Sequence, residues 1–157
     1  MRGTNWLAIG ASTSLGLIFI TAGLGKLPVP TESYAIFSIL PKPLLIPIFV
    51  KTVAFLLPRI ELILGLLLIV GIGAKFMASF SSVLIAIFIF HNFWMITGGL
   101  GSEPCNCFGE YGKVILAEIS VLEALYLDVG MLVLVSIILL YYPGNFFAIR
   151  PWFLRRR

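Results

Sequence analysis

The sequence predicts an all-α integral membrane protein that folds as a bundle of four transmembrane helices. Of the 157 residues, 60% are hydrophobic and only 11% are charged, whereas a soluble domain has about 45–50% apolar and about 25% charged residues. Four segments approach the length of about 20 apolar residues that a helix needs to cross a bilayer. This composition excludes a disordered chain, a coiled coil and an ordinary cytosolic enzyme, and the length fits one membrane domain over residues 1–157.

Four apolar segments are predicted to cross the membrane. They cover residues 5–25, 52–72, 76–97 and 124–142. The first stays apolar up to Lys26, which is too long a run for a cleaved signal peptide, so we expect it to be retained. The third has no formal charge, and the fourth stops at Pro143-Gly144, a common signal for the end of a helix.

Prolines and glycines mark the segments that connect the spans. Residues 28–51 contain five prolines, which exclude a single long helix, so we expect an interfacial loop with a short helix over residues 31–40. A tight turn over residues 71–75 joins the second and third spans as an antiparallel hairpin. Residues 98–113 form a glycine-rich outer loop, and residues 143–157 form a basic C-terminal tail.

The distribution of lysine and arginine predicts that both termini face the cytoplasm. With an even number of spans, this arrangement places six basic residues on the cytoplasmic side and four on the outer side, in line with the usual excess of basic residues in the cytoplasm. The Cys-x-Cys loop then faces outward, where a disulfide can persist. We therefore expect a multi-pass protein of the cell (inner or cytoplasmic) membrane, surrounded by the lipid bilayer.

The net charge of +4 does not indicate a nucleic-acid partner. Four of the eleven basic residues are arginines within the last eight positions, so the charge is not spread over a binding face. A basic cluster at the end of a membrane protein is typical of a topology signal that attracts anionic lipid headgroups.

The most informative stretch is Cys105-Asn106-Cys107 in the outer loop. Two cysteines are too few for a disulfide scaffold but enough for one redox pair. Thiols one residue apart form a disulfide only in a small strained ring, which makes the bond labile and ready to exchange. The spacing favours thiol–disulfide exchange with a partner. A structural staple, separate disulfides to other proteins and metal ligation are the alternatives, and metal ligation is the weakest because no second cysteine pair is present.

Several ionisable residues lie within or at the edge of the predicted spans, toward the outer side. Lys26 ends the first span, Glu61 lies in the outer half of the second, and Asp128 lies near the start of the fourth. Such groups are costly inside a membrane and usually face the interior of a bundle or a cavity. We expect an ion pair between Lys26 and Glu61, with Arg59 as the alternative cation, and its role is either structural or functional.

His91, the single histidine, lies about two helical turns below the outer end of the third span. A neutral imidazole at this depth could accept a proton or donate a hydrogen bond to a quinone carbonyl. It could also be an axial ligand to haem or chlorophyll, and the plain alternative is a histidine that forms a hydrogen bond inside the bundle. Lys26, Glu61 and His91 are thus the candidate cofactor-binding residues, with quinone as the candidate cofactor and no metal expected.

The first span also carries small residues at four-residue spacing, namely Ala8, Ser12 and Gly16. Small residues repeated in this way let the backbones of two membrane helices approach closely. We expect the stripe to pack against another helix of the same bundle rather than to form a dedicated dimer face.

Short motifs along the chain resemble those of the DoxX-like and MauE (methylamine-utilisation) membrane proteins, and they occur in the same order. Residues 19–27 resemble the AGxxKL end of the family's first helix, and residues 57–65 resemble its second-helix motif lPxxElxlG. Residues 105–109 are similar to the CxCFG loop of the MauE branch, and Asp128 is similar in position to an acidic residue that opens the fourth helix. The resemblance covers residues 15–140.

This resemblance implies a four-helix membrane bundle that takes part in redox or disulfide chemistry. MauE is associated with maturation of a disulfide-rich periplasmic enzyme, and DoxX-type proteins with quinone-coupled oxidation of sulfur compounds. We therefore expect a membrane redox protein in which Cys105 and Cys107 exchange electrons with a thioredoxin-like extracytoplasmic partner, and Glu61 or His91 handles the protons. The alternative is a non-catalytic accessory subunit of a larger membrane redox or photosynthetic complex, which packs lipids or pigments between larger subunits.

Overall fold

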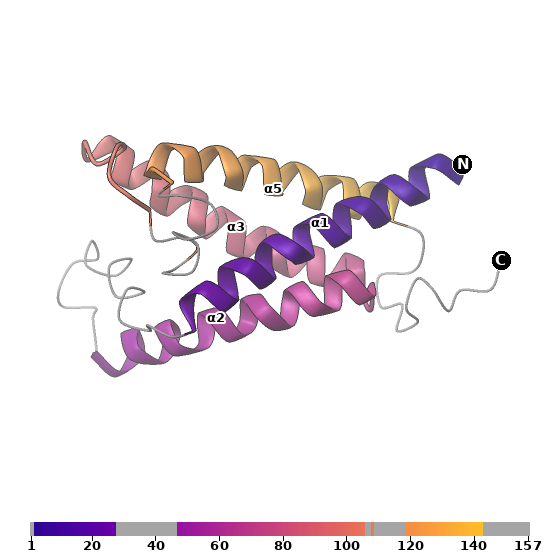
Figure 1. Ribbon diagram of the computed structural model, residues 1–157, viewed down its shortest axis with the longest axis horizontal. Helices are drawn as coiled ribbons and strands as arrows, with labels where there is room; N and C mark the ends of the chain where they lie inside the picture. Colours follow the sequence, from indigo (N-terminus) through magenta and orange to yellow (C-terminus); the bar gives the residue numbers. More distant parts are fainter. Residues whose placement is uncertain (1, 28–46, 106–107, 109–118, 143–157) are drawn as a thin grey trace.

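The described part of the chain is entirely helical apart from turns and one isolated bridge. The computed structural model describes residues 2–27, 47–105, 108 and 119–142, and contains no strand within them (Figure 1). The helices are α1 (Arg2–Lys26), α2 (Pro47–Val70), α3 (Ala74–Thr97) and α5 (Val121–Tyr141). The predicted all-α class is confirmed for this part of the chain, while the segments predicted over residues 31–40 and 143–157 lie outside it.

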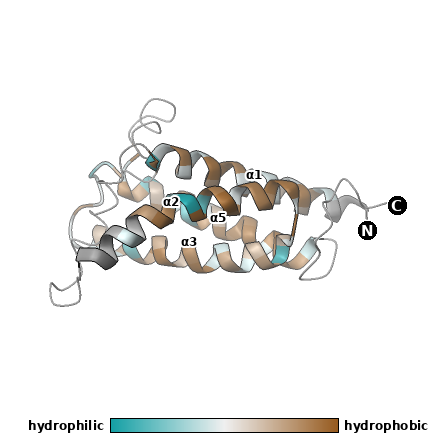
Figure 2. Cartoon of the chain, turned by 90° about the horizontal axis from the view of Figure 1, so that it is seen from below, coloured by the Kyte–Doolittle hydropathy of each residue, from teal (hydrophilic) through white to brown (hydrophobic). Residues whose placement is uncertain are grey.

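Three of the helices are long and apolar enough to cross a membrane: Trp6–Lys26, Ala74–Thr97 and Val121–Tyr141. Figure 2 shows hydrophobic residues along all four helices, as expected where lipid rather than water surrounds a bundle. The largest difference from the predicted spans is at α2, which begins at Pro47 instead of residue 52. The predicted loop over residues 28–51 is therefore too long. Pro47 lies in the first turn of α2, where a proline is tolerated.

The helices pack as two pairs that are joined through α1. The main contacts are between α1 and α2 and between α3 and α5, and α1 also packs along α5. The tight turn predicted between the second and third spans is confirmed, with Gly71 and Gly73 at φ values of 77° and 57° that glycine adopts without strain. Yet α2 and α3 touch little beyond this turn. Instead, α2 packs mainly against α1, and α3 packs mainly against α5.

A close contact between α1 and α2 explains the small residues of the first span. Ala8 is fully buried, and the Ser12 hydroxyl donates a hydrogen bond of 2.6 Å to the main-chain carbonyl of Leu68. A Cβ added at Gly16 would lie 2.7 Å from the carbonyl oxygen of Gly65, and one added at Gly65 would lie 2.6 Å from that of Gly16. The predicted packing within one bundle is confirmed, and its mechanism is direct approach of two backbones.

The segment around Cys105 is attached to the start of α5 by main-chain hydrogen bonds. The Cys105 amide donates to the Ile119 carbonyl at 2.7 Å, and the Val121 amide donates to the Glu103 carbonyl at 3.0 Å. Between them, Pro104 and Ser120 form an antiparallel bridge. Cys105 is therefore fixed by main-chain hydrogen bonds beside the start of α5.

Ser120 caps α5 in a reciprocal arrangement. Its hydroxyl accepts from the Glu123 amide at 3.3 Å, and the Ser120 amide donates to the Glu123 carboxylate at 2.8 Å, which together make a capping box. We expect Ser120→Ala to lower the free energy of unfolding by about 1 kcal/mol. Denaturant titration in detergent micelles measures this, with Ser136→Ala, which removes only a hydroxyl bonded within α5, as the control. Equal losses in the two variants would contradict the capping role.

Candidate functional site

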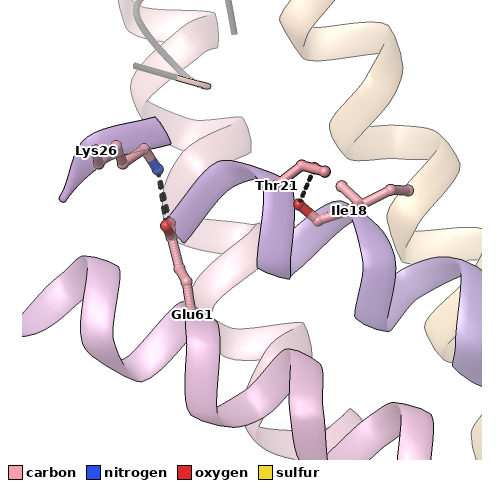
Figure 3. Close-up of polar contacts among 4 residues, drawn as sticks. All are labelled: Ile18, Thr21, Lys26 and Glu61. Atoms are coloured by element: carbon pink, nitrogen blue, oxygen red, sulfur yellow. Dashed lines mark hydrogen bonds and ion pairs between the residues drawn. The ribbon is translucent and has the colours of Figure 1, made fainter. Parts of the chain in front are cut away.

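An ion pair joins the end of α1 to the middle of α2. The Lys26 ammonium nitrogen lies 2.7 Å and 3.0 Å from the two carboxylate oxygens of Glu61 (Figure 3). The Glu61 side chain is fully buried and that of Lys26 is 11% exposed. The predicted Lys26–Glu61 pair therefore forms. Arg59, the alternative cation, instead donates to the Phe55 carbonyl and lies over the ring of the same residue.

The close approach of α1 and α2 positions this pair. A Cβ on Gly23 would lie 2.8 Å from the carbonyl oxygen of Pro58, so only glycine fits at this crossing. Lys26 follows Gly23 by three residues and Glu61 follows Pro58 by three, so both side chains lie about one helical turn from the crossing. The motif over residues 19–27 and the motif over residues 57–65 thus form the two sides of one helix–helix contact.

A second buried polar contact joins α3 to α5. The Asn92 amide nitrogen lies 2.8 Å from a carboxyl oxygen of Asp128, and both side chains are at most 5% exposed. The sequence indicated Asp128 as an intramembrane acid but did not single out Asn92. The buried positions of α3 include Ala78, Ser81, Ile85 and Asn92, which recur at helical spacing. Extending the pattern of small and apolar residues along the helix would therefore have predicted that Asn92 faces inward.

His91 precedes Asn92 and is half-buried. Neither the Lys26–Glu61 pair nor the Asn92–Asp128 hydrogen bond includes its imidazole. The structure thus brings together Lys26 and Glu61 from the predicted set, but it places Asn92 rather than His91 on the inward face of α3. A catalytic or cofactor role of His91 stays a prediction.

Lys26 links the two polar contacts. Its ammonium lies 5.4 Å from the centre of the Phe88 ring on α3, within the range of a cation–π interaction. Its charge also interacts electrostatically with Asp128 on α5. Each of the four helices therefore contributes one polar side chain to a single cluster, which we call the polar cluster: Lys26, Glu61, Asn92 and Asp128.

Cys105 is disulfide-bonded and partly exposed, next to the start of α5. The other cysteine of the chain, Cys107, lies outside the described residues. Within the described part of the chain, no group of three or more His, Cys, Asp or Glu side chains is arranged to hold a metal ion. The arrangement thus places a disulfide-bonded cysteine at the rim and a cluster of buried polar and ionisable side chains inside the bundle.

Comparison with known proteins agrees with the motifs. The family model described as "Methylamine utilisation protein MauE" matches residues 4–142, which include α1 from its third residue, all of α2, α3 and α5, and the polar cluster. None of the curated proteins and none of the solved structures matches the chain. The DoxX-like part of the resemblance stays a prediction. Since the match covers most of its length, the chain belongs to the MauE family of methylamine utilisation proteins.

Proposed function

We propose that this protein is a membrane redox protein that exchanges electrons through a Cys105–Cys107 disulfide with an extracytoplasmic, thioredoxin-like partner. The observation that carries the proposal is the disulfide at Cys105, on a segment attached to the start of α5. The family name adds a setting, methylamine utilisation, in which such a protein would have an accessory role. Orientation with the cysteines outside the cytoplasm follows from the predicted topology.

The reaction transfers two electrons in two thiol exchanges. A thiolate of the partner attacks one sulfur of the pair, so that a mixed disulfide forms and the other cysteine leaves as a thiolate. The partner's second thiolate then attacks the mixed disulfide. The partner ends as a disulfide, and Cys105 and Cys107 end as two thiols after taking up two protons. The reverse sequence would oxidise this pair and reduce the partner.

A lipid-soluble quinone is the acceptor that we propose for returning the pair to the disulfide. Lys26 has three N–H donors, and its two hydrogen bonds within the described part of the chain both go to Glu61, which leaves a third donor for a quinone oxygen among these residues. The residues proposed to hold it are Lys26, Glu61 and His91, at the same end of the bundle as Cys105. When bound, a quinone would supply the capacity to take two electrons and two protons. Haem or chlorophyll ligation by His91 is a weaker proposal.

Electron transfer from a reduced thioredoxin-type protein tests this function. The full-length protein in nanodiscs is mixed with the reduced donor, and free thiols are alkylated and counted by mass spectrometry. We expect Cys105 and Cys107 to become alkylated together while the donor is oxidised. The Glu103→Gln variant, altered beside the pair at an exposed side chain, is expected to behave like the unaltered protein.

The accessory-subunit function makes the opposite prediction. A chain that only fills space in a larger redox or photosynthetic complex would keep its disulfide unchanged in this assay and would copurify in fixed ratio with larger subunits, with pigment or haem absorbance. A Cys105→Ser, Cys107→Ser double variant that remains fully active in cells would also contradict the redox function.

A further inference from the structure

The polar cluster contains two acidic groups but one cation. Glu61 is matched by Lys26 at 2.7 Å and 3.0 Å, whereas Asp128 has a hydrogen bond from the neutral amide of Asn92. If both acids were ionised, the cluster would hold an excess negative charge inside an apolar bundle. Burying such a charge is costly, and proteins avoid the cost by binding a proton. The composition of the cluster therefore favours one bound proton, and Asp128 is the acid expected to carry it, because its hydrogen-bond partner is neutral.

The described groups around Asp128 agree with this excess of acidic over basic groups, on α1 and α3, which pack against α5, and on α5 itself. α1 presents Lys26, whose charge interacts with Asp128, and α2 presents Glu61 through its contact with that lysine. α3 presents the amide of Asn92, with His91 beside it on a less buried face. On α5 itself, the Glu123 carboxylate is exposed and bonded to Ser120 at the rim. No second cation among the described residues faces Asp128.

The contact with Asn92 suits a carboxyl group that changes its protonation state. A side-chain amide donates to a carboxylate through its nitrogen, and after turning over it accepts from a carboxylic acid through its oxygen. The same two residues can therefore satisfy Asp128 with or without its proton, without any movement of the backbone. An apolar residue at position 92 would leave the ionised form of the acid without a donor.

We propose that the polar cluster is a proton-holding site in which Asp128 carries an exchangeable proton, regulated by the Lys26–Glu61 ion pair. Asp128 lies seven residues into α5, about 10 Å below its first residue along the helix axis. The segment that holds Cys105 is attached to the start of the same helix, so the expected route to the rim runs along the first two turns of α5 toward that segment. Exchange with the outer aqueous phase is the expected direction. This inference does not rest on the cysteine chemistry, although it would supply a proton store for it.

Asp128 is the single aspartate of the chain, so it can be observed without any mutation. We suggest cell-free synthesis of the full-length protein with aspartate labelled with 13C at the side-chain carboxyl carbon, followed by reconstitution into nanodiscs. The 13C chemical shift of this carbon distinguishes a carboxylic acid from a carboxylate. At mildly acidic pH we expect the signal of the protonated acid, moving to the carboxylate position as the pH is raised through neutrality. A carboxylate signal that persists through the mildly acidic range, as for an exposed aspartate, would overturn the proposal.

Two variants test the role of the ion pair. In Glu61→Gln, Lys26 loses its partner and becomes available to Asp128, so we expect the carboxylate signal to persist to more acidic pH than in the unaltered protein. In Lys26→Met, the cluster loses its cation, so we expect the acid signal to persist to more alkaline pH than in the unaltered protein. Glu103→Gln, at the exposed rim, is the control and is expected to leave the titration unchanged. A titration that is the same in all four proteins would overturn the link between Asp128 and the pair.

Discussion

Replacing Lys26 with methionine is expected to destabilise the bundle by about 3–5 kcal/mol, the usual cost of leaving one partner of a buried ion pair without the other. Methionine keeps most of the length of the lysine side chain but removes the ammonium that lies 2.7 Å from the Glu61 carboxylate. Glu61 is fully buried, so water cannot replace the lost cation. Denaturant titration in mixed micelles, followed by circular dichroism, measures the loss.

Two further variants separate the ion pair from a general effect of charge. Arg59→Met removes the alternative cation, which lies outside the pair, and is expected to change stability by no more than about 0.5 kcal/mol. Lys26→Met combined with Glu61→Gln removes both charges together and is expected to recover most of the loss, because no unpaired charge remains. A Lys26→Met variant as stable as Arg59→Met would contradict the buried ion pair.

Gly16→Ala is expected to destabilise the protein by about 1–3 kcal/mol, the usual cost of overpacking a tight contact. The new Cβ would lie 2.7 Å from the carbonyl oxygen of Gly65 and 2.7 Å from the Ile69 side chain. The main-chain oxygen cannot move aside without separating α1 from α2. Gly65→Ala meets the Gly16 carbonyl in the same way and is expected to cost a similar amount, also by denaturant titration.

The same helix offers a matched control for this contact. Gly10 lies on α1 and is exposed, with nothing within 4 Å of an added Cβ. Gly10→Ala is therefore expected to leave stability unchanged or to raise it by up to about 1 kcal/mol, because alanine is the better helix former. If Gly10→Ala and Gly16→Ala change stability in the same direction and by the same amount, close packing of α1 on α2 is wrong.

Three of the four predicted spans and the ion pair could be predicted because they depend on local features of the sequence. A run of about 20 apolar residues has few alternatives to a membrane helix, and an isolated lysine at the end of one span needs the acid in the next. The first turn of α2 was not predicted, because in a proline-rich sequence Pro47 indicates a loop when the packing partner of the segment is unknown. The choice of Lys26 over Arg59 was right on position alone, since Arg59 and Glu61 are two residues apart and face different directions.

The pairing of helices could not be predicted in the same way. The turn between α2 and α3 suggested that these two helices pack together, but contacts with α1 and α5 decide the arrangement. Asn92 was missed for the same reason, because its role depends on Asp128 36 residues away. His91 was predicted from the chemistry of its side chain, whereas the inward face of α3 is defined by its small and apolar residues. Which of two adjacent polar residues points inward is decided by packing between helices.

The reduction potential of the Cys105–Cys107 pair tests the proposed function most directly. Full-length protein in detergent is equilibrated with a series of glutathione or dithiothreitol buffers, and thiol alkylation is followed by mass spectrometry. We predict reversible two-electron behaviour with a potential above about −230 mV, in the range of proteins that exchange disulfides. A pair that stays reduced across the series, or a disulfide with a potential below about −300 mV, as structural disulfides have, would contradict the redox function.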